Sequence, residues 1–406
     1  MERLVGPIVV IADTHVGLSA GERFYMLRNN SGCDVLGLSG FIRWLERLET
    51  GRVAVPRGRW GGPLELQRPS HLILLGDYLE LWDASDAAVD ISCRSIWNMM
   101  ERLTCEKIYV IGNHDFASNQ LTGRYPQGAS FIQVLPDSYP SREAGKAAWL
   151  RTDDTSFLFV HGHQFDWAFR HLGKVWTLVS YLRDGAEAFR LWSWVLVLVA
   201  FGALLVGFLP SPLSSVLASL AAALLLAGAL PRLIVTVARP AWNHLAGTRY
   251  EPSKALTGFV HWWKHWIGEK PLPDGRLCIV YGHTHLMDIY NSAEIRKHTG
   301  RTLPEQLTLV NLPSWVSDVR DEYQKIFRDV ALYIDDSGFH LLGWDWRKQQ
   351  PFYIPEDAAR TVAAGIPLDE QLAQGLATIG WPEKLLAKLK QPPVILAQRR
   401  PVRVSA

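Results

Sequence analysis

Residues 7–15 read PIVVIADTH, a short apolar run that ends in an aspartate and a histidine. Four further runs are likewise apolar, bounded by turn-forming residues and followed by polar side chains: HLILLGD (71–77), KIYVIGNHD (107–115), SFLFVHGH (156–163) and RLCIVYGHTH (276–285). Apolar runs of about four to six residues between turn signals predict strands that are buried on both faces. Such a sheet is covered on both faces, so the expected fold class is α/β.

The polar residues that follow these runs are of the types that bind metals. Ligands of α/β sheets collect at the carboxyl ends of the strands, where all five runs place His, Asp or Asn. Asp13 and His15 are two positions apart, as are His283 and His285, so both members of each pair can face the same way. The candidate ligands are Asp13, His15, Asp77, Asn113, His161, His283 and His285.

This set predicts a particular kind of metal chemistry. Four histidines, two aspartates and one asparagine are too many for one tetrahedral zinc. They suit two divalent ions of intermediate hardness, for which we predict Mn²⁺, with Fe or Zn²⁺ as alternatives. Two ions about 3.5–4 Å apart clamp the attacking and leaving oxygens of a phosphoryl transfer and supply hydroxide near neutral pH.

The order of the five blocks, D-x-H (13–15), G-D (76–77), G-N-H-D (112–115), His161 and G-H-x-H (282–285), resembles the calcineurin-like metallophosphoesterase family. The resemblance implies a four-layer α-β-β-α sandwich with two metals. It also implies the ligands: Asp13, His15 and His285 for one metal, Asn113, His161 and His283 for the other, and Asp77 bridging both. His114 would be the catalytic residue that meets the phosphate or leaving group, oriented by Asp115.

Three longer stretches are similar to one branch of that family, the UDP-2,3-diacylglucosamine pyrophosphatases. They are GDYLELWD (76–83), HGHQFDW (161–167) and LVNLPSWVSD (309–318). In that branch a helical insertion between the H-G and G-H-x-H blocks forms a lid over the acyl chains of the substrate. The resemblance implies hydrolysis of a phosphodiester or pyrophosphate bond in a lipid-linked substrate.

The corresponding interval here contains a long apolar segment, residues 191–231. No Asp, Glu, Lys or Arg occurs between Arg190 and Arg232. The runs 191–209 and 213–230, separated by Pro-Ser-Pro, are each roughly 27–29 Å long as helices, close to the hydrocarbon thickness of a bilayer. A buried helical hairpin is the alternative, but such helices normally carry a polar stripe. We therefore predict a transmembrane hairpin inserted in the lid.

The flanks of the hairpin predict its orientation. Arg183, Arg190, Arg232 and Arg239 lie beside it, whereas its tip carries no charge. By the positive-inside rule, the catalytic domain and both termini are expected in the cytoplasm, at the inner membrane. The expected partners are the lipid bilayer and a lipid-linked phosphate substrate.

Composition restricts the other classes of function. The chain has 406 residues, 48% of them hydrophobic, and a formal net charge of +2, which gives no reason to expect binding to nucleic acid. Its four cysteines show no paired spacing, so neither a zinc ribbon nor a disulfide framework is expected.

The expected organisation has four parts: a metallophosphoesterase domain in two segments (1–170 and 276–349), a helical lid insertion (171–275) and a C-terminal helical tail (350–406). Residues 49–69 are expected to form a surface loop, 329–346 a closing hairpin and 368–390 helix.

The stretch HWWKHWIGEK (261–270) has two interpretations. Its tryptophans could lie among lipid headgroups or pack the lid against the catalytic domain. His261 and His265, one helical turn apart, indicate a surface helix rather than a metal pair, and His163 has no assigned role.

The sequence thus predicts a membrane-anchored, dinuclear-metal phosphohydrolase of a lipid-linked substrate. An alternative is a tethered metallophosphoesterase that acts on a soluble nucleotide or phosphoprotein. A third hypothesis, a non-catalytic membrane scaffold, is disfavoured because the ligand set is intact.

Overall fold

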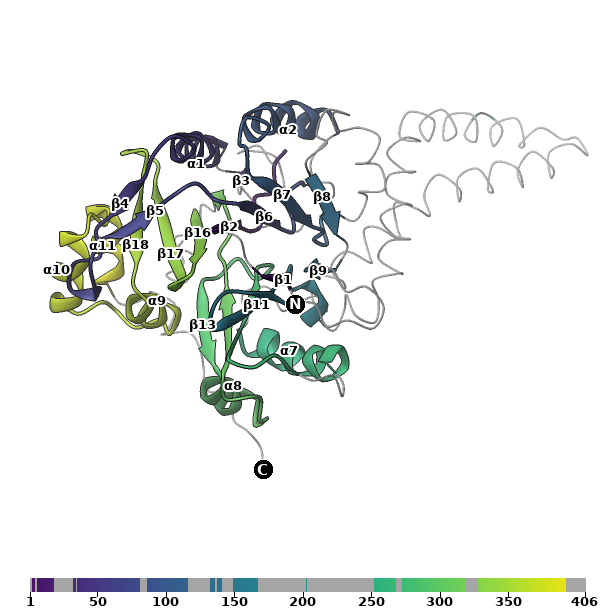
Figure 1. Ribbon diagram of the computed structural model, residues 1–406, viewed down its shortest axis with the longest axis vertical. Coiled ribbons are helices and arrows are strands. Elements are labelled where there is room, and N and C mark those ends of the chain that lie inside the picture. The colour runs from purple at the N-terminus through teal and green to yellow at the C-terminus, as the bar shows by residue number, and fades with distance from the viewer. Residues whose placement is uncertain are drawn as a thin grey trace, which may run out of the picture. The chain divides into compact units, whose positions relative to one another are not determined.

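A computed structural model describes residues 2–3, 6–17, 32–33, 35–80, 86–115, 132–135, 137–140, 149–166, 202, 252–267, 272–317 and 328–391. Two compact units divide the chain: one is Met1–Phe165 with Thr248–Ala406, and the other is Asp166–Gly247. All helices and strands labelled in Figure 1 belong to the first unit.

Two large sheets form this unit (Figure 1). In order across the first sheet, the strands are β1 (Glu2–Arg3), β10 (Leu150–Arg151), β11 (Thr155–Val160), β12 (Arg276–Tyr281), β14 (Leu307–Asn311) and β13 (Asp288–Asn291), with β9 (Ser138–Tyr139) paired to β11. Across the second they are β18 (Gln350–Ile354), β17 (Gly338–Asp345), β16 (Val330–Asp335), β2 (Ile8–Ile11), β6 (His71–Leu75), β7 (Glu106–Val110) and β8 (Ile132–Leu135). Two short pairs are separate: β3 (Gly32–Cys33) with β15 (Val316–Ser317), and β4 (Val53–Val55) with β5 (Leu64–Leu66).

The five predicted strands are all present, as β2, β6, β7, β11 and β12. Strands β2, β6 and β7 are parallel neighbours, and so are β11, β12 and β14. Since the carboxyl ends of parallel neighbours lie at one edge of a sheet, each sheet gathers the residues after its strands at one edge. The predicted closing hairpin is also confirmed, by the antiparallel pair β16 and β17.

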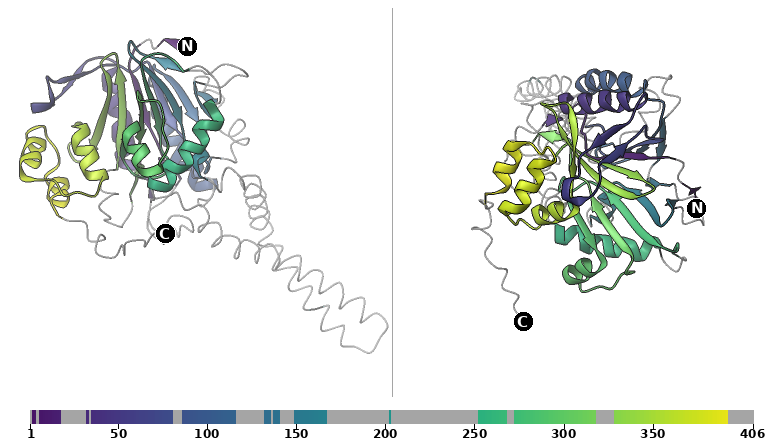
Figure 2. Two further views of the ribbon diagram at one scale, coloured as in Figure 1. Left: turned by 90° about the horizontal axis from the view of Figure 1, so that it is seen from below. Right: turned by 60° about the vertical axis from the view of Figure 1, so that its left-hand side comes forward.

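Helices cover the outer faces of the two sheets (Figures 1 and 2). The second sheet packs against α1 (Val35–Leu48) and α2 (Asp86–Met100), and the first against α7 (Pro252–Ile267) and α8 (Ser292–Thr299). This is the expected order of layers, helix, sheet, sheet and helix.

Strand β2 shows how the sequence specifies these layers. Ile8 and Val10 belong to the core between the sheets, whereas Val9 and Ile11 belong to the core beneath α1 and α2. Successive side chains of a strand point to opposite faces, so a strand buried on both faces must be apolar at every position. This explains why the run IVVI has no polar alternation.

Three helices at the C-terminal end pack on the core between the sheets: α9 (Glu356–Ala363), α10 (Glu370–Thr378) and α11 (Glu383–Leu389). The last two confirm the helix expected within 368–390, and α9 lies in the expected helical tail (350–406), whereas the strand β18 was not predicted. The expected loop 49–69 contains β4, the 3₁₀ helix η1 (Gly58–Trp60) and β5.

The tryptophans of α7 settle one open interpretation. Trp262, Trp263 and Trp266 are buried in the core that α7 shares with β11 and β12. They therefore pack the helix against the first sheet, and the idea that they lie among lipid headgroups is wrong. His261 and His265 are exposed, as expected for a surface helix.

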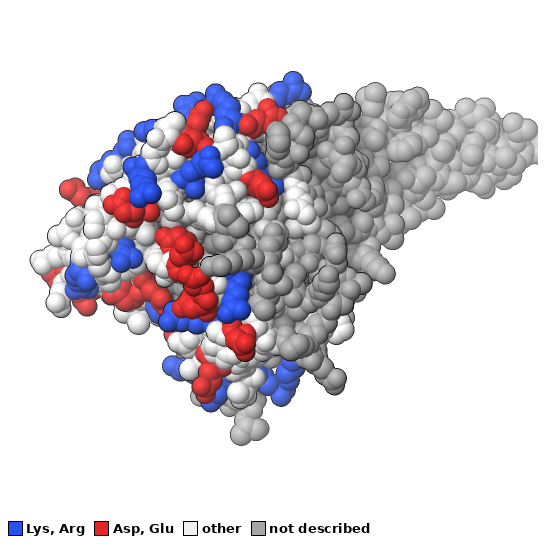
Figure 3. Space-filling view, in the orientation of Figure 1, with Lys and Arg blue, Asp and Glu red and all other residues white. Residues whose placement is uncertain are grey.

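The predicted membrane hairpin, 191–231, lies outside the described residues apart from position 202. Among the helices that are described, none has both the length and the hydropathy of a membrane span. On the face drawn in Figure 3, acidic and basic side chains are interspersed over the described residues.

Candidate metal centre

The structure brings all seven predicted ligand residues together at the ends of strands from both sheets. They are buried, with exposed fractions from 0% to 6%. They follow the strands in this order: Asp13 and His15 after β2, Asp77 after β6, Asn113 after β7, His161 after β11, and His283 and His285 after β12.

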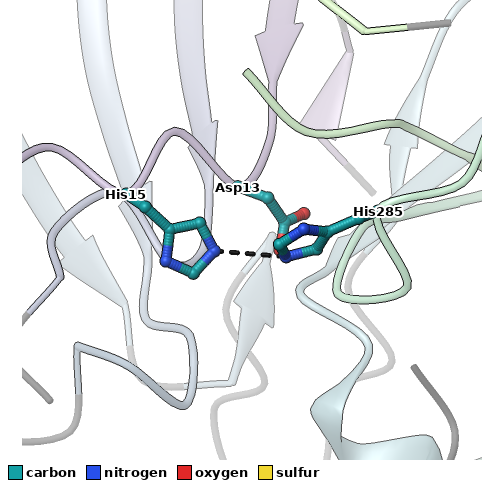
Figure 4. Close-up of side chains that lie close together, drawn as sticks. All are labelled: Asp13, His15 and His285. Carbon is teal, nitrogen blue, oxygen red and sulfur yellow. Dashed lines mark hydrogen bonds and ion pairs between the residues drawn. The ribbon is translucent and has the colours of Figure 1, made fainter. Parts of the chain in front are cut away.

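Asp13, His15 and His285 form the first grouping that could hold a metal (Figure 4). The Nε2 atoms of His15 and His285 are 3.2 Å apart, and Nε2 of His285 is 3.5 Å from Oδ1 of Asp13. Two imidazole nitrogens and a carboxylate oxygen at this spacing are suitable ligands for one divalent ion.

Asp77, His161 and His283 form the second grouping, and a third, His15, Asp77 and His114, overlaps the first at His15 and the second at Asp77. Nε2 of His161 is 3.3 Å from Oδ2 of Asp77 and 3.1 Å from Oδ1 of Asn113. The same Oδ2 atom of Asp77 lies 3.8 Å from Nε2 of His15, which belongs to the first grouping. One carboxylate oxygen thus faces both groupings, as a bridging ligand would.

The two aspartates carry the clearest indication that cations belong here. Oδ2 of Asp13 accepts a hydrogen bond from the backbone N–H of His283 (2.8 Å), and Oδ1 of Asp77 accepts one from that of His114 (2.7 Å). The other oxygen of each carboxylate is buried and makes no well-formed hydrogen bond within the described residues. A buried carboxylate oxygen in that state is costly unless a cation compensates it. The residues therefore fit two divalent metals.

Five of the ligand residues have left-handed backbone conformations. Their φ values are 50° at Asp13, 46° at His15, 46° at Asp77, 70° at His283 and 60° at His285. Such values are uncommon outside glycine and persist only where surrounding contacts enforce them. One enforcing contact is the bond from the N–H of His15 to the carbonyl of Asp77 (2.9 Å), which ties two ligand loops together.

The glycines of the motifs allow neighbouring ligands to approach. A methyl group at Gly282 would overlap Oδ2 of Asp13, and one at Gly112 would overlap Oδ1 of Asp77. Each glycine therefore leaves room for a ligand from a different motif, which explains the recurring G before D, N or H.

Glu80 is a site residue that sequence reasoning missed. Its carboxylate is fully buried and hydrogen-bonds to Nδ1 of His15 and Nδ1 of His114, both at 2.8 Å. These bonds fix both rings and direct the chemistry of each toward its Nε2 atom. The available signal was an acid within the apolar run YLELW, where a buried carboxylate requires partners.

The structure pairs His114 with a carboxylate other than Asp115, so the orientation of His114 by Asp115 stays a prediction. Glu80, not Asp115, is the carboxylate bonded to Nδ1 of His114. Oδ1 of Asp115 accepts from the N–H of Leu79 (2.9 Å) and Oδ2 from that of Gly112 (2.8 Å). Asp115 therefore holds the backbone of two ligand loops. Burial, reinforced by the charge of Asp77, raises the pKa of Asp115 to about 7.

Burial and neighbouring charges shift the pKa values of three ligand residues, Asp77, His161 and Asp13. Burial opposes the charge of Asp77, but the charges of His161 and His114 outweigh it and hold the pKa of Asp77 well below its usual range. Burial likewise disfavours protonated His161, yet Asp77 and Asp13 raise its pKa to about 9. Burial raises the pKa of Asp13 to about 6. Cations that bind here must displace protons, so binding should release them.

His163 lies beside the second grouping, although it was not among the predicted ligands. Its ring centroid is 5.4 Å from that of His161 and 6.5 Å from that of His283. Burial and the charge of His161 lower its pKa to about 3, so the ring is neutral at physiological pH.

Of the comparisons with known proteins, the family match agrees with this chemistry. Residues 6–201 match the protein family described as calcineurin-like phosphoesterase, a segment that holds the first five predicted ligands. A solved structure, a dimetal phosphatase from Danio rerio, is similar at 11% sequence identity and a TM-score of 0.38, over 84% of this chain and 96% of that chain. No curated protein sequence matches this chain.

Proposed function

We propose that the substrate of this protein is a lipid-linked phosphodiester or pyrophosphate at a membrane. The proposal starts from a metal-dependent phosphoesterase with a calcineurin-like metallophosphoesterase domain. The observation that carries the chemistry is the single Asp77 oxygen that faces both metal groupings. The observation that supports a lipid substrate is the charge-free segment 191–231 between His161 and His283.

Two bound metals would supply the charge and the activated water that the proposed hydrolysis needs. When bound, two divalent ions supply positive charge for the phosphoryl oxygens and lower the pKa of a water molecule. We propose Mn²⁺ as the native metal, because the mixed histidine, carboxylate and amide ligands suit an ion of intermediate hardness. Asp13, His15 and His285 would hold one ion, Asn113, His161 and His283 the other, and Asp77 both.

The protein groups around the metals bind and orient the reactants. His114 would contact the phosphate or the leaving oxygen and supply a proton there. Because Nδ1 of His114 is bonded to Glu80, that transfer would use Nε2. The Glu80 carboxylate, whose pKa the neighbouring histidines lower against the effect of burial, remains charged and stabilises a protonated ring.

The membrane part of the proposal rests on the sequence of residues 191–231. Two apolar runs of membrane-spanning length, flanked as a pair by Arg190 and Arg232, would anchor the catalytic unit on the cytoplasmic side of the inner membrane. An acyl chain could then reach the site through an apolar path, and each buried CH₂ contributes about 0.8 kcal/mol to its capture.

The test replaces 191–231 with a short Gly/Ser loop and compares two substrates in detergent with Mn²⁺. We expect turnover of a soluble p-nitrophenyl phosphodiester to be retained and turnover of a nucleoside-diphosphate lipid to fall by at least 10-fold. Detergent dispersion removes the concentrating effect of a shared membrane.

Retained turnover of both substrates would reject the lipid proposal and leave a tethered phosphoesterase of soluble nucleotides or phosphoproteins. If neither wild type nor variant hydrolyses any of these substrates with Mn²⁺, the scaffold hypothesis would take its place. Metal analysis and circular dichroism of the variant identify a loss caused by misfolding.

A further inference from the structure

Thr284 lies between the ligands His283 and His285 and shapes the backbone there. Its Oγ1 atom accepts a hydrogen bond from the N–H of Leu286 (3.2 Å), two residues on. This contact closes a turn around His285, which has a φ of 60°. A Thr side chain that bonds to the backbone two residues later stabilises such a turn and so offsets the cost of the left-handed conformation.

Asn311 fixes the hydroxyl that closes this turn. It is the last residue of β14, is 1% exposed, and donates through Nδ2 to Oγ1 of Thr284. Its backbone is tied to the same region, since the next residue, Leu312, donates its N–H to the carbonyl of Tyr281 (2.7 Å). Asn311 therefore reaches the ligand loop from the adjacent strand and holds the rotamer of Thr284.

The segment that begins at Asn311 also reaches the other ligand loop. The N–H of Trp315 donates to the carbonyl of Asp13 (3.1 Å), and the Trp315 ring is fully buried, 5.1 Å from that of Phe41. The stretch NLPSW, residues 311–315, thus contacts the loops that carry Asp13 and His285, two ligands of the same grouping.

We propose that Asn311 is a positioning residue of the metal centre: through Thr284 it holds His283 and His285 in the geometry that binds both metals. The proposal rests on the metal centre of the proposed function but not on its lipid substrate. Residues that orient metal ligands typically contribute about 10- to 100-fold to metal affinity or activity.

The experiment measures metal affinity without any substrate. Full-length protein in detergent is titrated with Co²⁺, and its visible absorption reports both the number of sites and their affinity. We expect Asn311→Leu, which lacks the donor, and Thr284→Val, which lacks the acceptor, each to weaken Co²⁺ binding by about 10- to 100-fold. Because both variants break the same bond between Asn311 and Thr284, the losses in the double variant should be less than additive.

Two control variants separate positioning from general stability. Thr284→Ser keeps the hydroxyl and should bind Co²⁺ within threefold of wild type. Asn291→Ala removes another structural asparagine, whose side chain accepts from the N–H of Glu294 (2.9 Å) at the start of α8, and should lower Tm without changing Co²⁺ affinity.

Three results would overturn the proposal. They are Co²⁺ binding by Asn311→Leu within threefold of wild type, an equal loss of affinity in Asn291→Ala, and fully additive losses in the double variant. None of them depends on which substrate the enzyme hydrolyses, so the lipid proposal can fail while this one stands.

Discussion

The role of each residue in the centre depends on which of its polar atoms is already hydrogen-bonded within the protein. Asp13 and Asp77 each have one oxygen fixed by a backbone N–H and one left for a cation. His15 and His114 both have Nδ1 fixed by Glu80, so their chemistry is confined to Nε2. Whether His114 acts as a ligand or as a proton donor is therefore a matter for experiment, because His15 and His114 are held in the same way and both lie near Asp77.

Substitution of His114 distinguishes these two roles. His114→Ala should keep both metals and lose about 10²-fold or more in kcat, as expected when a proton donor or charge-stabilising group is removed. Metal content by mass spectrometry and steady-state kinetics on the same preparation give the answer. A loss of metal in parallel with activity would show that His114 is a ligand.

Glu80→Gln provides the matched comparison. Glu80 contacts His15, a predicted ligand, as well as His114, so this variant should lose metal affinity and rate together. His114→Ala should lose rate alone.

Asp288 provides a pH test at a carboxyl group that is not among the candidate metal ligands. It is 4% exposed, and burial raises its pKa from 3.8 to about 7, against the opposing hydrogen bonds of Tyr290 and Asn311. The folded state therefore keeps a proton that the unfolded state loses, and the free energy of unfolding falls as pH rises through this window.

Asp288→Asn should remove that dependence. Relative to wild type, metal-free Asp288→Asn should gain stability between pH 4 and pH 8, by at most about 4 kcal/mol at 1.4 kcal/mol per pKa unit. Urea unfolding of both proteins across this range measures the difference. A difference that is constant with pH contradicts a raised pKa at Asp288.

At the scale of elements, the ends of the strands are more specialised than the strands themselves. The strands are similar apolar runs. The turns after them combine ligand residues in left-handed backbone conformations with glycines that leave room for a neighbouring loop. The loops therefore hold one another, as the bond from the N–H of His283 to Asp13 illustrates. A substitution in one turn should therefore displace a ligand residue on another turn and weaken metal binding.

Gly282→Ala tests this coupling. The added methyl group would overlap Oδ2 of Asp13 and the side chain of Ala12, so Asp13 must move. We expect metal affinity to fall by more than about 10-fold, measured by competition with a chelator. Gly51→Ala, where a methyl group meets nothing within 4 Å, is the control and should bind metal normally. Normal affinity in Gly282→Ala would mean that the loops adjust independently.

The sequence predicted the strands and the candidate ligands because both depend on short, local patterns. An apolar run bounded by turns is a local signal, and so is a His two residues after an Asp. Glu80 was missed because its partners are 65 and 34 residues away in the sequence, and only folding brings them together. The same reason explains Asn311 and Thr284, which are 27 residues apart.

At the scale of the whole molecule, the centre exists only where the two sheets meet. One sheet contributes Asp13, His15, Asp77 and Asn113, and the other contributes the histidines 161, 283 and 285. The α/β class was predictable because continuous apolar strands need cover on both faces, whereas the four-layer order was implied only by the resemblance to a known family. Strand β18 was missed, because residues 350–406 were expected to form a helical tail.

Metal stoichiometry of wild type and Asp77→Ala tests the central claim most directly. The claim is that one carboxylate from the second sheet joins two metal groupings. We predict two Mn²⁺ ions per chain in the wild type, and in Asp77→Ala a loss of bound metal together with phosphodiesterase activity. Two ions per chain in Asp77→Ala would contradict the account.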